Sequence, residues 1–270
     1  MRWEQLLNQV LLVALFTFVI HLSETLTYAL RSAGVRLGKL AVALSLSGII
    51  LLVSRTANMV QAPLTGKIID YAKSHADYNV LDQLRIIIGA STLGTLAALL
   101  LFPSAVFLSS RIISHFEVAG SIPQMVRSSV SFQKLHNARH HLRAPKLSML
   151  SRLRIGGIPK RLVILNAVVT AIYTIGVLAA LLASTLTIEN QTAALQSSGL
   201  INGIATILLT ILIDPQIGLV TDKVLRGEKE VAALNKVFGL LMISRLIGTL
   251  LAQLLLVPAA YWITWMASII

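Results

Sequence analysis

The chain contains no cysteine and few charged residues, and both absences restrict what it can be. Without cysteine there is no disulfide framework, no thiolate metal site and no thiol nucleophile, so the sequence gives no sign of a redox compartment. Charged residues make up 13% of the 270 residues, hydrophobic residues make up 56%, and the mean hydropathy is +0.79. This composition is too apolar for a soluble domain of that length. We therefore expect an all-α membrane protein.

Six apolar segments are long enough to cross a bilayer, at roughly 20 residues per crossing. They cover about 6–30, 40–63, 86–108, 162–186, 198–220 and 237–257. The first is longer than the apolar region of a signal peptide and has no small-residue cleavage site after it, so we expect no cleavable signal. The sequence after Pro258 stays apolar and carries interfacial aromatic residues. The sixth helix should therefore either kink at Pro258 or be followed by a short interfacial piece.

Three sequence signatures occur twice in the same order, which predicts an internal duplication. Segment 43–50 (ALSLSGII) returns as 194–201 (ALQSSGLI), the PxxGxxxD pattern ending at Asp70 returns ending at Asp222, and 93–96 (LGTL) returns as 247–250 (IGTL). Because three spans is an odd number, the second copy should enter the membrane in the opposite orientation. We predict two inverted three-helix repeats, 1–110 and 162–270, joined by a basic linker at 111–161. Inverted repeats are typical of transporters that work by alternating access.

Basic residues are concentrated in this linker, and their distribution predicts the membrane topology. The ten are Arg111, Arg127, Lys134, Arg139, Arg143, Lys146, Arg152, Arg154, Lys160 and Arg161. The positive-inside rule makes the linker cytoplasmic. The loops at 31–39 and 223–236 are also basic and fall on the same side, so both termini should be outside. Topology thus accounts for the net charge of +12, and we expect no nucleic-acid partner.

The linker has two open interpretations. Residues 147–153 have apolar residues at helical spacing, which suits a short helix lying on the anionic lipids of the inner leaflet. A solvated connector that only fixes topology explains the same residues equally well. His136, His140 and His141 have no carboxylate or cysteine nearby, which favours a loop over a metal site. We predict neither a metal nor a cofactor.

Several ionisable or polar residues fall inside the predicted spans, where a charge costs roughly 3 kcal/mol and needs a partner, a water-filled cavity or a function. They are His21 and Glu24 on the first span, Arg55 and Asn58 on the second, Asp214 on the fifth and Arg245 on the sixth. A purely structural interpretation pairs Glu24 or Asp214 with Arg245. Taken together, the six residues favour a polar cavity.

Within this set, Arg55 is the strongest candidate for substrate binding. Its counterpart in the second repeat is apolar, around Ile207, and no carboxylate is evident at its depth. A guanidinium without such a partner suits bidentate binding of a phosphate or diphosphate. We assign Arg55, Asn58 and Arg245 to substrate binding.

The acidic residues and the histidine have a second interpretation. His21, Glu24 and Asp214 can change charge when buried, so we assign them to coupling of protons or cations, or to the cavity wall. Asp70 and Asp222 follow the glycine of each repeated signature and are candidates for gate contacts or helix caps. The small residues of 45–48 and 197–203 should allow close packing at a moving interface, or simply ordinary helix packing.

Two segments carry a resemblance to a known family. The pattern His21-x-x-Glu24-Thr25-x-x-Tyr28-Ala29-x-Arg31-x-x-Gly34-x-Arg36, followed by 54–63 (SRTANMVQAP), resembles the Amj family of bacterial lipid II flippases. The Asp214-Pro215 segment fits as well, and the resemblance covers essentially the whole chain. It implies translocation of lipid II, the undecaprenyl-pyrophosphate-linked disaccharide-pentapeptide, across the cytoplasmic membrane. The resemblance supplies no residue roles, so the site assignments rest on burial and charge.

Two other classes of function stay open. A polyprenyl-diphosphate phosphatase would need clustered acidic residues and a nucleophile beside an arginine. Ser54-Arg55-Thr56 partly matches this requirement, but the expected Glu-x-x-x-Glu pair is absent. A small-solute or ion exporter would centre on Glu24 and Asp214. A pure scaffold would not explain so many intramembrane charges, so a transporter rather than an enzyme is the preferred interpretation.

Overall fold

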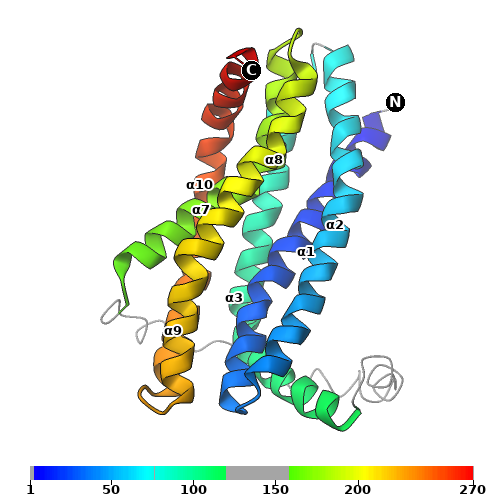
Figure 1. Cartoon of the computed structure of the whole chain (residues 1–270). Helices are drawn as coiled ribbons and strands as arrows, with labels where there is room; N and C mark the ends of the chain where they lie inside the picture. Colours follow the sequence, from blue (N-terminus) through cyan, green and yellow to red (C-terminus); the bar gives the residue numbers. More distant parts are fainter. Residues whose placement is uncertain (1–2, 76, 120–157, 270) are drawn as a thin grey trace.

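The computed structural model describes residues 3–75, 77–119 and 158–269, and this part of the chain is helical (Figure 1). The helices are α1 (Trp3–Arg36), α2 (Leu40–Ser74), α3 (Val80–Ala119), α7 (Lys160–Leu186), α8 (Gln191–Leu208), the π-helix η2 (Leu209–Ile213), α9 (Asp214–Leu225) and α10 (Val231–Ile269). Six helical segments are long and apolar enough to cross a membrane, with α8, η2 and α9 forming one continuous segment. The predicted all-α membrane protein with six spans is confirmed.

The helices are longer than the apolar segments that predicted them. Residues 258–269 continue α10, which runs through Pro258 without a break. Pro63 and Pro103 likewise lie inside α2 and α3 rather than at their ends. Hydropathy marks only the apolar middle of each helix, whereas backbone hydrogen bonding extends it into the polar boundary region.

Each half of the chain packs around its first helix. In the first half α1 packs on α2 and α3, and in the second half α7 packs on α8 and α10. The halves meet chiefly where α3 packs on α10. Both described chain ends lie at the upper end of the bundle in Figure 1, and the α1–α2 and α9–α10 connections lie at the lower end. Gly38 and Gly227 close these lower connections with φ of 66° and 76°, a conformation that favours glycine.

Two glycines from one repeated signature allow close contact between helices. A Cβ at Gly94 of α3 would collide with the backbone carbonyl of Phe18 on α1. A Cβ at Gly248 of α10 would collide in the same way with the carbonyl of Ala167 on α7. The threonine after each glycine is fully buried. Small residues at these crossings let the two backbones approach each other, as is usual in membrane helix packing.

The other predicted packing glycines behave differently. A Cβ at Gly48, Gly199 or Gly203 would meet no atom within 4 Å, so these glycines do not pack closely in this structure. Asn202, from the same stretch, does pack closely, because its side-chain oxygen lies against Gly176. The expectation of close packing along 45–48 and 197–203 therefore holds only in part.

Most of the predicted basic linker, including the proposed surface helix at 147–153 and the residues His136, His140 and His141, lies outside the described residues. Its described edges belong to neighbouring helices: α3 extends past residue 110 to Ala119, and α7 begins at Lys160. Glu117, near the end of α3, forms an ion pair with Lys39 in the α1–α2 connection. This contact attaches the last turns of α3 to the lower end of the first half.

Candidate functional site

A polar cavity of about 260 Å³ lies between helices of both halves. Its wall comes from α1, α2, α7 and α8. The lining residues are Thr17, Ile20, His21, Asn58, Gln61, Ala62, Thr65, Tyr173, Thr174, Val177, Leu178 and Asn202. More than half of these side chains carry hydroxyl, amide or imidazole groups. Polar groups at this depth in apolar helices indicate a site for a polar ligand, since hydrocarbon cannot satisfy them.

Glu24 is the centre of a hydrogen-bonded cluster beside this cavity. Its Oε1 accepts hydrogen bonds from Ser54 Oγ of α2 at 2.7 Å and from Tyr173 OH of α7 at 3.4 Å. Its Oε2 accepts from Arg245 Nη2 of α10 at 2.9 Å. The Glu24 and Arg245 side chains are only 11% and 13% exposed. One carboxylate thus connects four helices through charge-assisted hydrogen bonds.

His21 lies one turn before Glu24 on α1 and faces the cavity. It is 3% exposed, and its Nδ1 has no hydrogen-bond partner among the described residues. The side-chain oxygens of Gln61 and Asn202 are also buried and without a partner in the described part of the chain. Gln61 does donate from its Nε2 to Thr17 at 3.0 Å. The cavity wall therefore offers several unused polar groups to a ligand.

The structure brings four of the predicted site residues together. Glu24 and Arg245 form the ion pair, while His21 and Asn58 line the adjoining cavity. The pairing of Glu24 with Arg245, one of the two structural alternatives, is the observed one. Arg245 is not among the cavity-lining residues, and its Nη2 donates to Glu24.

Arg55 lies next to Ser54 on α2, one turn from Asn58. Its side chain is exposed, and no ion pair reaches it from any residue that the structure describes. Arg55 is not among the cavity-lining residues, but Asn58, one turn further along α2, is. Arg55 is therefore a cation beside the cavity that is available to an anionic ligand.

The remaining predicted residues lie apart from this cluster. Asp214 is exposed at the junction of η2 and α9, and Asp70 is exposed near the end of α2. Asp222 pairs with Arg226, four residues later at the end of α9. That contact stabilises a helix end and does not join two helices.

Sequence reasoning missed Ser54, Gln61 and Tyr173 as members of the site, and took Asn202 only as a packing residue. Each is neutral, so a search for intramembrane charges passes over it. A weak signal was present in Tyr173, which carries a hydroxyl near the middle of α7, where the other side chains are mostly aliphatic. The contact between α7 and α2 and the hydrogen bond from Tyr173 to Glu24 of α1, which give Tyr173 its role, depend on tertiary packing.

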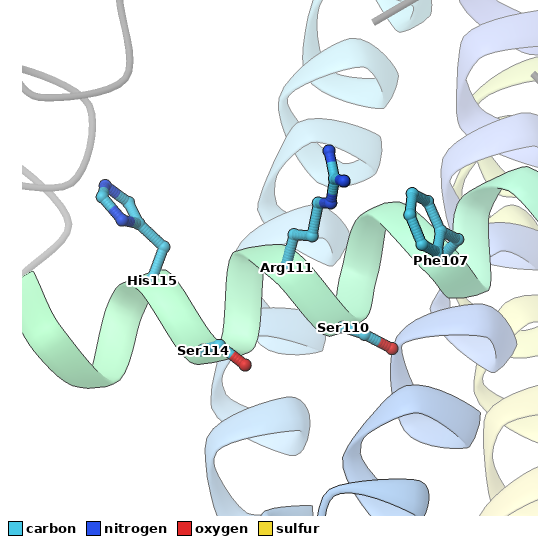
Figure 2. A pocket seen from close by; sticks show the side chains of 5 residues that line it. All are labelled: Phe107, Ser110, Arg111, Ser114 and His115. Atoms are coloured by element: carbon cyan, nitrogen blue, oxygen red, sulfur yellow. The ribbon is translucent and has the colours of Figure 1, made fainter. Parts of the chain in front are cut away.

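A second depression lies on the surface of α3, away from this cavity (Figure 2). Phe107, Ser110, Arg111, Ser114 and His115 line it, and the Arg111 guanidinium lies 4.6 Å from the centre of the Phe107 ring. In Figure 2 the three larger side chains stand on one side of the helix and the two serines on the other. Within the described residues no cluster of three or more histidine, cysteine or acidic side chains suits a metal ion.

These features define a multi-span membrane protein with a polar cavity between its two halves. Residues 16–267 match the Amj family, described as "Alternate to MurJ", and the chain belongs to this family. It is similar to the lipid II flippase Amj of Bacillus subtilis (strain 168), with 44% identity over 262 residues, which cover 97% of each chain. No solved structure matches the chain. The family resemblance predicted from segments 21–36 and 54–63 is confirmed.

Proposed function

We propose that this protein is a lipid II flippase that moves the undecaprenyl-pyrophosphate-linked peptidoglycan precursor from the inner to the outer leaflet of the bacterial cytoplasmic membrane. The similar Bacillus subtilis protein bears that activity in its name and aligns with nearly the whole chain. The structural observation that carries the proposal is the polar cavity among the spans, with the exposed cation Arg55 beside it. This arrangement suits transport rather than hydrolysis, because no acidic cluster surrounds Ser54 in the described structure.

The three chemical parts of lipid II suit three features of this site. Its diphosphate is anionic and suits the Arg55 guanidinium, which binds phosphate oxygens in a bidentate manner. Its sugars and peptide need hydrogen bonds, which Asn58, Gln61 and Asn202 offer from the cavity wall. Its polyprenyl tail must stay in lipid. The helices α2 and α8 border the cavity without packing extensively on each other, and we propose that the tail leaves the cavity between them.

The proposed transport cycle relies on two inverted repeats, 1–110 and 162–270. The repeated signatures support this, as does the matching use of Gly94 and Gly248 at the α1–α3 and α7–α10 crossings. The helices that carry the PxxGxxxD pattern also run in opposite directions, because α2 ends at the top of Figure 1 and α9 ends at the bottom. Rocking of one half against the other would expose the cavity to each side in turn.

The proposed orientation has both termini outside and residues 111–161 in the cytoplasm. It rests on the excess of basic residues in the linker and in the 31–39 and 223–236 loops. The lower end of Figure 1 then faces the cytoplasm. The basic linker lies next to the anionic inner leaflet, and we propose that it binds anionic lipids there.

The deciding experiment replaces the essential lipid II flippase of a depletable bacterium with this chain. An enzyme acting from outside the cell, which cleaves lipid II, then reports how much has reached the outer leaflet. We expect growth and cleavage with the wild-type chain and the loss of both with Arg55→Ala at normal protein level. Lys67→Ala, which removes another exposed cation of α2, is the matched control and should keep both. If lipid II stays protected in cells that make the wild-type chain, the proposed function is wrong.

A further inference from the structure

Three hydrogen-bond donors from three different helices converge on the carboxylate of Glu24. They are Ser54 Oγ of α2, Tyr173 OH of α7 and Arg245 Nη2 of α10, at 2.7, 3.4 and 2.9 Å from its oxygens. We call these three residues the donor cluster. A buried guanidinium and two hydroxyls directed at one point are the groups that proteins use to bind an anion. In this structure the anion that they bind is the carboxylate of Glu24.

We propose that the donor cluster is the diphosphate-binding site of the transported lipid, and that Glu24 occupies it in the empty protein. This inference rests on the proposed flippase function and deepens it. The carboxylate of Glu24 stands where phosphate oxygens of the substrate bind, so loading is an exchange of one anion for another on the same donors.

The position of the donor cluster makes this exchange possible. Tyr173 belongs both to the cluster and to the cavity wall, so it connects the cavity to the donor cluster. Arg55 follows Ser54 in the chain and supplies an exposed second cation next to the cluster. Arg245 is not part of the cavity wall, and its Nη2 is bound to Glu24. The diphosphate therefore reaches Arg245 only after Glu24 withdraws.

The guanidinium of Arg245 also has unused capacity. Glu24 takes one hydrogen bond from Nη2, while the Nε of Arg245 is buried and has no partner among the described residues. A guanidinium satisfies two acceptor oxygens at once when the ligand presents them side by side. A diphosphate group does so, whereas Glu24 in its present position does not. The donor cluster is thus better matched to the proposed ligand than to its present occupant.

Exchange at the donor cluster would couple substrate binding to helix movement. In this structure the cluster connects α1 to α2, α7 and α10 through Glu24. Two anions cannot share these donors without strong repulsion, so a bound diphosphate releases α1 and connects the other three helices itself. The ligand then has different interaction energies with the two arrangements, which is the requirement for driving a conformational change. A purely structural ion pair would give no such coupling.

Binding to the purified full-length protein distinguishes the two roles. The probe is farnesyl diphosphate, with farnesyl monophosphate as the shorter-headgroup comparison, measured by titration calorimetry at fixed pH. Glu24→Gln removes the competing charge but keeps the side-chain shape, so we expect it to bind farnesyl diphosphate about tenfold more tightly than wild type. Glu117→Gln removes the carboxylate of the exposed Lys39 ion pair, and this matched control should bind as wild type does. Unchanged or weaker binding by a folded Glu24→Gln protein would overturn the inference.

A second variant covers the case in which Glu24→Gln fails to fold. Tyr173→Phe removes one donor of the cluster, on a residue that lines the cavity, and leaves the ion pair in place. We expect it to bind farnesyl diphosphate several-fold more weakly, with a smaller effect on the monophosphate, and wild-type affinity would overturn the inference. The proposed function is tested separately in cells. If the wild-type chain exposes lipid II while these variants leave diphosphate binding unchanged, only the role of the donor cluster is wrong.

Discussion

Glu24 on α1 and Arg245 on α10 form a buried ion pair between the first and last spans, 221 residues apart in the chain, with Arg245 Nη2 2.9 Å from the carboxylate. The pair joins the two halves of the bundle. Such a pair contributes little net stability compared with apolar side chains of similar size, because both charges lose their hydration. Its persistence in an apolar bundle therefore favours a functional role for at least one of the partners.

The ion pair makes a direct prediction about stability. Arg245→Ala leaves the Glu24 carboxylate buried with only hydroxyl partners, so the folded protein should lose about 3–5 kcal/mol. The double variant Glu24→Gln with Arg245→Met removes both charges and should recover most of that loss. Thermal unfolding of the purified protein in detergent measures both. Equal destabilisation by the single and double variants would show that lost packing, rather than an unpaired charge, is responsible.

Transport should depend on the shape of the charged group at position 55 as well as on its charge. Arg55→Lys keeps a positive charge but loses the planar pair of donors that binds two phosphate oxygens. We expect lipid II exposure to fall several-fold in this variant, and thermal stability to stay at the wild-type value because the side chain is exposed. The outside-cleavage assay and a melting curve test the two parts. Full exposure with lysine would instead favour a site that needs only a point charge, as in an ion exporter.

Gly94 and Gly248 should be intolerant of any side chain. Alanine at either position places its Cβ against a backbone carbonyl of the neighbouring helix, and such overpacking costs about 1–3 kcal/mol. Gly203→Ala is the matched control, since its Cβ would meet no atom within 4 Å. Thermal unfolding of the three variants provides the measurement. Equal melting temperatures for all three would contradict the close helix crossings.

The sequence predicted the membrane spans well because burial in lipid imposes long apolar runs that are visible in composition. It also identified Gly94 and Gly248 through their repeated signature, although their contacts with Phe18 and Ala167 required the structure. Helix ends were predicted less well, since the sequence left open whether the sixth helix continues past Pro258, and the structure shows that α10 does so. A proline inside a membrane helix is tolerated when neighbouring groups satisfy the freed backbone carbonyl, and that depends on packing.

The sequence predicted the charged residues of the candidate site but not its neutral hydrogen-bond donors. The spacing of His21 and Glu24 placed both on one face of α1, and Arg245 was recognised as a possible partner. Ser54 and Tyr173 became relevant only when α2 and α7 were seen to converge on Glu24. Asp214 is exposed and is not among the residues that line the cavity, so its assignment to coupling or to the cavity wall stays a prediction. The sequence of a single span does not determine which face of the helix contacts the neighbouring helices.

The absence of cysteine makes the topology directly testable, since any introduced cysteine is the only one present. Ser74 ends α2 at the upper end of Figure 1, and Lys229 lies in the lower α9–α10 connection. Each is replaced by cysteine in a separate variant, Ser74→Cys and Lys229→Cys. If the termini are outside, a membrane-impermeant maleimide should label intact cells only at position 74. Labelling at position 229 should require permeabilised cells. The reverse pattern would invert the proposed orientation of the whole bundle.

Cross-links at the two ends of the bundle test whether the halves must separate during transport. At the upper end, Lys73 Nζ of α2 donates to Gln191 Oε1 of α8 at 3.0 Å. At the lower end, Ser32 Oγ of α1 donates to Asn235 Oδ1 of α10 at 2.7 Å. Cysteine pairs at these positions can be bridged by a short, reducible bis-thiol reagent. Alternating access requires each end to open in turn, so either bridge should stop lipid II exposure and reduction should restore it.

The single cysteine variants, treated with the same reagent, are the controls for chemical damage and should retain exposure. A bridge at one end that leaves transport intact would mean that the two helices it joins do not separate during the cycle. If neither bridge has an effect, rocking of the halves is excluded as the mechanism. Transport would then depend on movement within one half, for which the π-helix η2 in the fifth span is the natural hinge, because its wider turn interrupts the regular hydrogen bonding of α8 and α9.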